Sequence, residues 1–131
     1  MIEIIIGEFC FSASHKLTFE NGSGSNIHGH EWHLTVFVRS LDPDETGISI
    51  NYQLLRDMIQ EQVDRLNRKF LNDLPIFAGK NPTDEMISKV LFQVLSEKIN
   101  SQDHQVCAVE IWHSGRRHIK YSREVCIDDP K

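Results

Sequence analysis

Two segments near the N-terminus alternate apolar and polar side chains, a period that predicts β-strands with one buried face. In residues 2–15 a bulge at Gly7 shifts the phase. The side chains that share one face there are Ile2, Ile4, Ile6, Phe9, Phe11, Ala13 and His15. In residues 28–39 they are His28, His30, Trp32, Leu34, Val36 and Val38. A Gly/Ser/Asn-rich loop at 20–27 separates the two segments, so the chain is expected to begin with a β-hairpin.

Helical spacing follows in the middle of the chain. Asn51 is expected to cap a helix over residues 52–67, and Asn81-Pro82-Thr83 opens a second one. The two apolar stripes are Leu55, Met58, Ile59, Val63 and Leu66, and Ile87, Val90, Leu91, Val94 and Leu95. Two strand-like runs, about 105–113 and 118–127, close the chain as a second hairpin.

The order strand–strand–helix–helix–strand–strand (ββααββ) predicts an α+β fold. Each helix is apolar along one stripe, so both should cover one face of a four-stranded antiparallel sheet. The 131 residues suit a single domain, 1–131. Such a sheet has two open edges, which ring-like oligomerisation would remove.

Composition excludes several classes of partner. The net charge is −5 and no basic stripe is present, which argues against a nucleic-acid partner. No segment has the length or apolar character of a membrane span or signal peptide. The three cysteines, Cys10, Cys107 and Cys126, form no Cys-x-x-Cys pair and are expected to be reduced thiols in a cytoplasmic protein.

Three histidines form a candidate metal site. Residues two apart on a strand share a face, so His28 and His30 can converge on one ion, and His15 ends the neighbouring strand. Three protein ligands would leave one coordination position open, as in a catalytic zinc site. A His-x-His pair in a strand is also common as polar surface or as a satisfied core pair, and the residues alone leave both interpretations open.

Several motifs resemble those of the 6-pyruvoyl-tetrahydropterin synthase and 6-carboxytetrahydropterin synthase family, nearly from end to end. The matching segments are Phe11-Ser12-Ala13-Ser14-His15, His28-Gly29-His30, the run from Thr46 to Tyr52, Leu71-Asn72-Asp73 and Asn81-Pro82-Thr83-Asp84-Glu85. The resemblance implies the tunnelling fold, with sheets joined into trimers or stacked dimers of trimers. It also implies Zn²⁺ bound by His15, His28 and His30, and a pocket for a small pterin-type substrate that Thr83 and Asp84 line from a neighbouring subunit.

The catalytic positions that the resemblance implies hold other residues here. Gly24 stands where the family has a cysteine that acts as a base, and a glycine cannot take up a proton. Glu20, in the same loop, is a candidate replacement if the loop folds inward; otherwise it is a solvated loop glutamate.

Asn67 and Arg68 stand where the family has an Asp–His pair, and neither can relay a proton. Arg68 is a candidate to bind an anion such as a phosphate. The alternative is an exposed cation favoured by the end of a helix.

His113, followed by Ser114, stands where the family has the glutamate that anchors the pterin. One imidazole cannot accept the two hydrogen bonds that a carboxylate accepts. His113 is therefore a candidate acid or base, or a contact to a different ring, and a structural strand histidine is the alternative.

All three metal ligands are kept while these catalytic positions differ. The resemblance therefore predicts a zinc-dependent lyase that eliminates triphosphate from dihydroneopterin triphosphate or a related pterin, with an altered substrate or mechanism. Two alternatives stay open. One is a non-catalytic relative that binds metal or pterin, and the other is a different tunnelling-fold activity on a purine or pterin, such as a cyclohydrolase or aldolase.

Overall fold

Five strands form one mixed sheet in the order β3-β1-β2-β4-β5 in the computed structural model, which describes residues 1–124. They are β1 (Ile2–His15), β2 (His28–Ser40), β3 (Lys69–Phe70), β4 (His104–Ser114) and β5 (Arg117–Ser122). Neighbours are antiparallel except β3, which runs parallel to β1. The α+β class is confirmed. The prediction of a four-stranded antiparallel sheet missed β3, because its two residues are too few to show an alternation.

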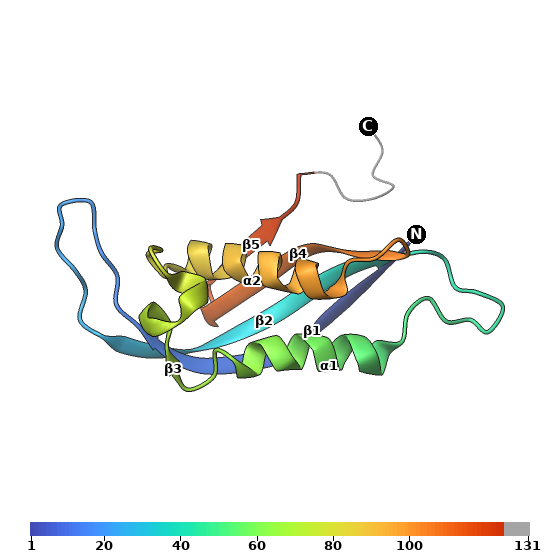
Figure 1. Ribbon diagram of the computed structural model, residues 1–131, viewed down its shortest axis with the longest axis horizontal. Coiled ribbons are helices and arrows are strands. Elements are labelled where there is room, and N and C mark those ends of the chain that lie inside the picture. Colours follow the sequence, from blue (N-terminus) through green and yellow to red (C-terminus); the bar gives the residue numbers. More distant parts are fainter. Residues whose placement is uncertain (125–131) are drawn as a thin grey trace.

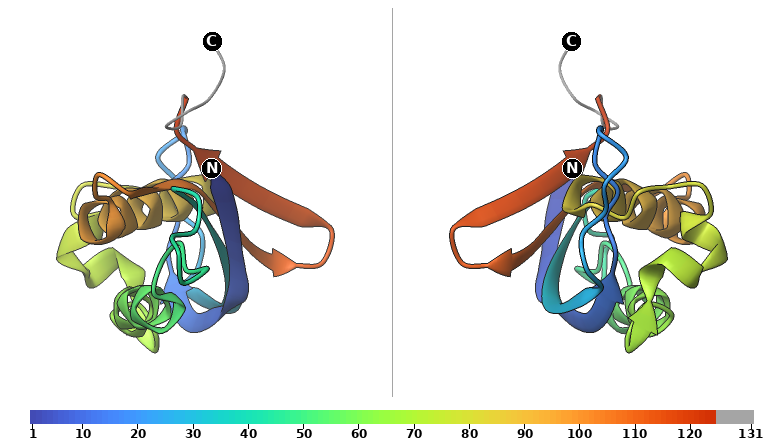
Figure 2. Two further views of the ribbon diagram at one scale, coloured as in Figure 1. Left: turned by 90° about the vertical axis from the view of Figure 1, so that its right-hand side faces the viewer. Right: turned by 90° about the vertical axis from the view of Figure 1, so that its left-hand side faces the viewer.

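Both helices lie on the same face of the sheet, as expected (Figures 1 and 2). They are α1 (Tyr52–Asp64) and α2 (Asp84–Ile99), with the short 3₁₀ turns η1 (Leu71–Asp73) and η2 (Pro75–Phe77) between them. Asn51 caps α1 by accepting from the Leu54 N–H, and Thr83 caps α2 by accepting from the Met86 N–H. Since each N-cap satisfies an amide that the helix cannot pair, these two residues determine where the helices begin.

One face of the β1–β2 hairpin forms the base of the core. The register between the strands shifts between Ile6 and Phe9, as the bulge at Gly7 predicts. The rings of Phe11 and Trp32 stack at 5.5 Å and are almost fully buried under the helices. The predicted apolar stripes of both helices pack on this face. On this same face of β1 and β2, His15, His28 and His30 lie next to the core, at the end of the hairpin.

Some expectations meet the limits of the described residues or are corrected there. The last part of the predicted strand 118–127 and Cys126 lie outside them. Cys10 is free and exposed. Cys107 is disulfide-bonded, so the expectation of a reduced thiol there was wrong, because spacing alone does not show which cysteines a fold brings together. Within residues 1–124, no helix is long and apolar enough to cross a membrane.

Candidate metal centre

His15, His28 and His30 converge at the end of the β1–β2 hairpin. In the antiparallel register His15 lies opposite His28, and His30 lies opposite Ala13. All three side chains therefore project from the face of the sheet that the helices cover. One nitrogen of each ring lies within 4.8 Å of one nitrogen of the others. The alternation of the two strands therefore brings the three predicted ligands to one end of one face.

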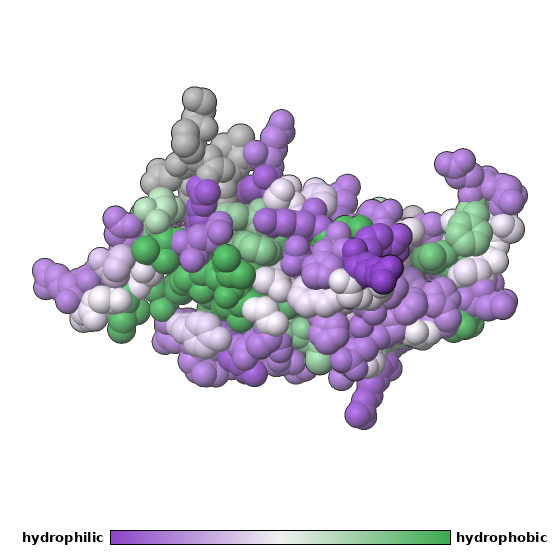
Figure 3. Space-filling view, turned by 180° about the vertical axis from the view of Figure 1, so that it is seen from behind, coloured by the Kyte–Doolittle hydropathy of each residue, from purple (hydrophilic) through white to green (hydrophobic). Residues whose placement is uncertain are grey.

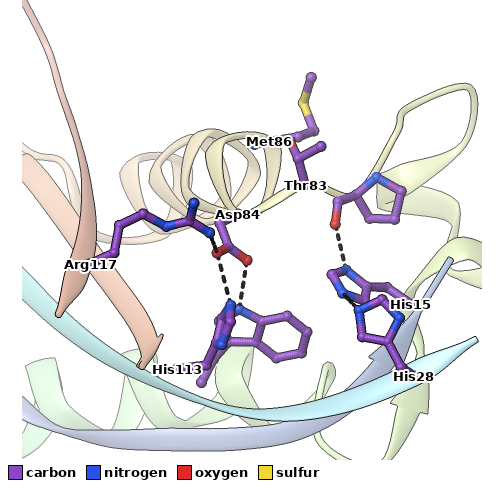
Figure 4. Close-up of polar contacts among 9 residues, drawn as sticks. His15, His28, Thr83, Asp84, Met86, His113 and Arg117 are labelled. Carbon is purple, nitrogen blue, oxygen red and sulfur yellow. Dashed lines mark hydrogen bonds and ion pairs between the residues drawn. The ribbon is translucent and has the colours of Figure 1, made fainter. Parts of the chain in front are cut away.

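Two of the rings are oriented by backbone carbonyls. His15 donates its Nδ1–H to the Pro82 oxygen at 2.8 Å, and His28 donates its Nδ1–H to the Asn26 oxygen at 2.8 Å. A carbonyl oxygen only accepts, so each Nδ1 carries the proton and each neutral ring has its lone pair on Nε2. These two Nε2 atoms face each other at 2.9 Å (Figure 4). Two lone pairs at this distance need a cation, either a proton or a metal ion, between them.

The surroundings disfavour the proton. Burial lowers the pKa of His15; the hydrogen bond to the Pro82 oxygen opposes this, the neighbouring His28 adds to it, and the net shift is downward. Burial also lowers the pKa of His30, with His113 as the next contribution. Neutral imidazoles are the form that binds a metal ion. Tetrahedral coordination with Zn–N bonds of about 2.1 Å separates two nitrogen ligands by about 3.4 Å, so the 2.9 Å pair needs only a small opening to fit. The donor set fits zinc, and imidazoles also suit copper, iron and nickel.

A carboxylate lies beside the histidines. Asp84, in the first turn of α2, accepts from Trp32 Nε1–H at 3.1 Å and from His113 Nε2–H at 3.0 Å. Arg117, on β5, lies 3.5 Å from the same oxygen as His113 (Figure 4). The His113 ring stacks on His30 with ring centres 3.9 Å apart. Asp84, expected to contact a substrate, is thus occupied by groups of the protein itself.

These residues line a single pocket of about 330 Å³. Its walls include all three histidines, Thr83, Asp84, His113 and Arg117. The sequence-predicted residues Thr83 and Asp84 therefore do lie beside the candidate metal ligands, in the same chain. Arg117 was not predicted, because its position on β5 beside α2 depends on how helix and hairpin pack.

Two asparagines that sequence reasoning missed fix the segment after His15. The Asn72 side chain accepts from the Lys16 N–H at 2.9 Å and donates to the Lys16 oxygen at 2.8 Å. The Asn81 side chain forms the same pair of bonds with Thr18, at 2.9 and 2.7 Å. Each amide thus imitates one residue of a neighbouring strand. Their presence in family-like motifs was the only signal available in the sequence.

The remaining predicted residues lie apart from this pocket. Glu20 is exposed in the loop between β1 and β2, which projects from the body of the molecule (Figure 1). Ser114 is exposed at the end of β4. Arg68 is exposed and lines a second cavity with Ser12, Ser14 and Lys69, and this cavity borders the first one at His30.

The fold and the three convergent histidines define the class: an α+β protein of the tunnelling-fold type with a candidate metal centre at one end of its sheet. The sequence profile described as 6-pyruvoyl tetrahydropterin synthase matches residues 4–124, so the chain belongs to this family.

Relatives and solved structures agree with that assignment. A 6-carboxy-5,6,7,8-tetrahydropterin synthase of Synechocystis sp. is 30% identical over 120 residues, covering 88% of this chain and 92% of the relative. A 6-pyruvoyl tetrahydrobiopterin synthase of Dictyostelium discoideum is 30% identical over 112 residues, covering 76% and 83%. The Caenorhabditis elegans 6-pyruvoyl tetrahydropterin synthase structure superposes with a TM-score of 0.80 at 20% identity, covering 95% and 98%. A Plasmodium vivax structure of the same name, described as a catalytic residue mutant with a glutamate replaced by alanine, gives 0.76 at 17% identity, covering 95% and 98%.

Proposed function

We propose that this chain is a zinc-dependent lyase that acts on dihydroneopterin triphosphate or a related pterin and eliminates triphosphate. The observation that carries the proposal is the pair of Nε2 atoms of His15 and His28, which face each other at 2.9 Å with both Nδ1 atoms bound to carbonyls. Metal-binding histidines commonly donate the other ring nitrogen to a backbone carbonyl in this way. Zinc bound there would polarise an oxygen of the substrate side chain.

The chain's own groups supply the rest of the chemistry. His113 is the candidate acid or base, because it lies in the metal pocket and donates to a carboxylate that orients its ring. Thr83, at the start of α2, also lines the pocket and is a candidate contact to the substrate. Ser114, next to His113, is a weaker candidate, since it is exposed outside the pocket.

Two charged residues outside this pocket stay candidates for other roles. Arg68 is a candidate contact to a phosphate group, because its cavity borders the histidine pocket at His30. Glu20 would need the 16–27 loop to fold over the histidines. The Plasmodium vivax relative described above has a catalytic glutamate, which supports keeping a glutamate among the candidates.

We also propose a homo-oligomer, a trimer or a dimer of trimers. β3 pairs only with Ala13 and Ser14, so most of the outer edge of β1 has no partner within residues 1–124. β5 is the other edge of the described sheet. Seen from behind, apolar surface gathers toward the end of the molecule away from the 16–27 loop (Figure 3). Such open edges and apolar surface favour association with further copies.

One experiment tests the proposed activity. The protein is loaded with zinc, dihydroneopterin triphosphate is added, and triphosphate release and new pterin products are followed. Release that His28→Ala abolishes is the expected result. Tight pterin binding without release would instead support the non-catalytic relative, and release only from a purine or another pterin would support a different tunnelling-fold activity. A metal analysis that finds no zinc bound to the purified protein, even after loading, would refute the zinc proposal.

A further inference from the structure

The third histidine of the metal centre is held differently from the other two. His15 and His28 each donate to a backbone carbonyl, which sets the direction of the Nε2 lone pair. Within residues 1–124, neither nitrogen of the His30 ring has a hydrogen-bond partner. The ring of His30 is instead confined by other rings: His113 stacks on it at 3.9 Å with an interplanar angle of 20°, and Trp32 meets it edge-on at 5.2 Å.

Both of these rings are bound to one carboxylate. The two oxygens of Asp84 are divided between them: Oδ1 accepts from Trp32 and Oδ2 accepts from His113. The Asp84 side chain is only 10% exposed, and Arg117 lies near the same Oδ2. A carboxylate that is nearly buried and accepts from two fixed donors has little freedom to rotate. Asp84 therefore holds at fixed positions the two rings that contact His30, and the centres of these two rings lie 5.7 Å apart.

We propose that Asp84 is a positioning residue for the metal centre, which holds the His30 ring toward the ion through His113 and Trp32. The inference rests on the proposed function only in requiring that the three histidines bind zinc. It assigns to Asp84 a role distinct from the substrate contact that the sequence predicts. Hydrogen-bonded partners behind metal ligands typically change metal affinity by about 10- to 100-fold when they are removed.

The test compares two neighbouring carboxylates of the same helix turn. Asp84→Asn keeps the shape of the side chain but replaces one acceptor oxygen by an N–H₂ donor. With one oxygen left, the amide side chain cannot use a separate oxygen to accept from each of Trp32 and His113. Glu85→Gln removes the same charge from the same end of α2 and from the same pocket, but Glu85 is exposed, and the acceptor for Trp32 and His113 is Asp84. Zinc affinity is measured for the purified full chain by competition with a chromophoric chelator. We expect Asp84→Asn to weaken zinc binding about 10-fold or more and Glu85→Gln to leave it within a factor of two. Equal effects of the two variants would overturn the proposal, because charge alone would then explain them.

A second set of variants shows whether Asp84 acts through His113. His113→Ala removes the stacked ring, and the double variant combines it with Asp84→Asn. If the route through His113 dominates, Asp84→Asn should change zinc affinity much less in the His113→Ala background than in the native chain. An undiminished effect would overturn the route through His113. Should Asp84→Asn not fold, His113→Ala alone tests the stack, and native zinc affinity in that variant would refute the role of the ring.

The visible absorption of the cobalt-substituted protein separates positioning from stability. At saturating cobalt, a variant that is only less stable should give the native spectrum. A changed ligand geometry should alter the band shape in Asp84→Asn and leave it native in Glu85→Gln. Thermal unfolding of the metal-free forms provides the comparison of stability. If the native chain binds no zinc, the proposed function fails; if it binds zinc and Asp84→Asn binds it equally well, only the positioning role fails.

Discussion

The two asparagines that clamp the segment after His15 allow a quantitative prediction. Asn81→Ala removes two hydrogen bonds to the backbone of Thr18, at 2.9 and 2.7 Å. A hydrogen bond contributes a net 0.5–1.5 kcal/mol, and these are solvent-exposed, so we take the lower part of that range and expect a loss of about 1–1.5 kcal/mol. Asn72→Ala removes the matching pair at Lys16 and should cost about the same.

Urea unfolding measures the effect, as a lower midpoint with an unchanged slope. Asn21→Ala is the matched control, since Asn21 also accepts two hydrogen bonds, from the Ser23 N–H and hydroxyl. Those bonds join residues two apart in an exposed loop, so their loss should cost no more than about 0.5 kcal/mol. Limited proteolysis should also cut the 16–27 loop faster in Asn81→Ala than in Asn21→Ala. Equal midpoints for these two variants would refute the claim that the long-range clamp stabilises the fold.

Three further predictions concern the core of the site, the sheet edge and the metal. Trp32→Phe keeps a ring in place but leaves Asp84 Oδ1 without its donor, so it should lower the free energy of unfolding by about 1–3 kcal/mol. The control Trp112→Phe, on β4, loses no bond to Asp84 and should lower the free energy of unfolding by less. A larger loss in Trp112→Phe than in Trp32→Phe would contradict this prediction. Arg68 has a positive φ of 61°, a conformation that glycine adopts more easily than alanine. Arg68→Gly should therefore be about 0.5–1 kcal/mol more stable than Arg68→Ala in thermal unfolding. An alanine variant more stable than the glycine variant would refute the backbone strain. Zinc at 100 times its dissociation constant should stabilise the protein by about 2.7 kcal/mol, so its removal with a chelator should lower the melting temperature by the corresponding amount. The His28→Ala variant, which lacks one ligand, is the control and should not respond to the chelator. An unchanged melting temperature in the native chain would contradict metal binding at this site.

The parts of the structure that the sequence predicted depend on local rules. A period of two assigns every side chain of β1 and β2 to a face, so the same pattern that predicts the core also brings His15, His28 and His30 together. Helix starts were predictable for a similar reason, because Asn51 and Thr83 each bond an amide three residues ahead. In these cases the residues that interact are close in sequence or are related by one hairpin register.

Contacts between distant segments could not be predicted in this way. Asp84 and His113 are 29 residues apart, and their bond depends on how α2 lies across β4. The clamps of Asn72 and Asn81 span 56 and 63 residues. β3 has only two residues, and its pairing with β1 follows from the turn after α1 rather than from any alternation. A single sequence contains no signal for the angle at which a helix packs on a sheet, and that angle decides which of these groups meet.

The residues that the sequence resemblance places at altered catalytic positions have structural uses in this fold. The Asn67 side chain accepts from the Ser12 N–H at 2.9 Å, and the Arg68 N–H donates to the Ser12 oxygen, so both attach the turn after α1 to β1. Gly24 pairs with Thr18, and a Cβ there would lie 3.2 Å from the Leu17 oxygen, so the hairpin leaves little room for a side chain.

A carboxylate–imidazole pair is present across the pocket instead, between α2 and β4. It adjoins the same three histidines, and its imidazole is stacked on His30. A proton-handling group at His113 would therefore reach a metal-bound substrate from the side of α2, whereas one at position 24 or 68 would approach from the loop or from the edge of the sheet. The absence of an ionisable side chain at Gly24 and at Asn67, the positions that the resemblance points to, is for this reason compatible with the proposed turnover. We therefore propose His113 as the residue on which turnover would depend, and His113→Ala in the triphosphate-release assay tests this.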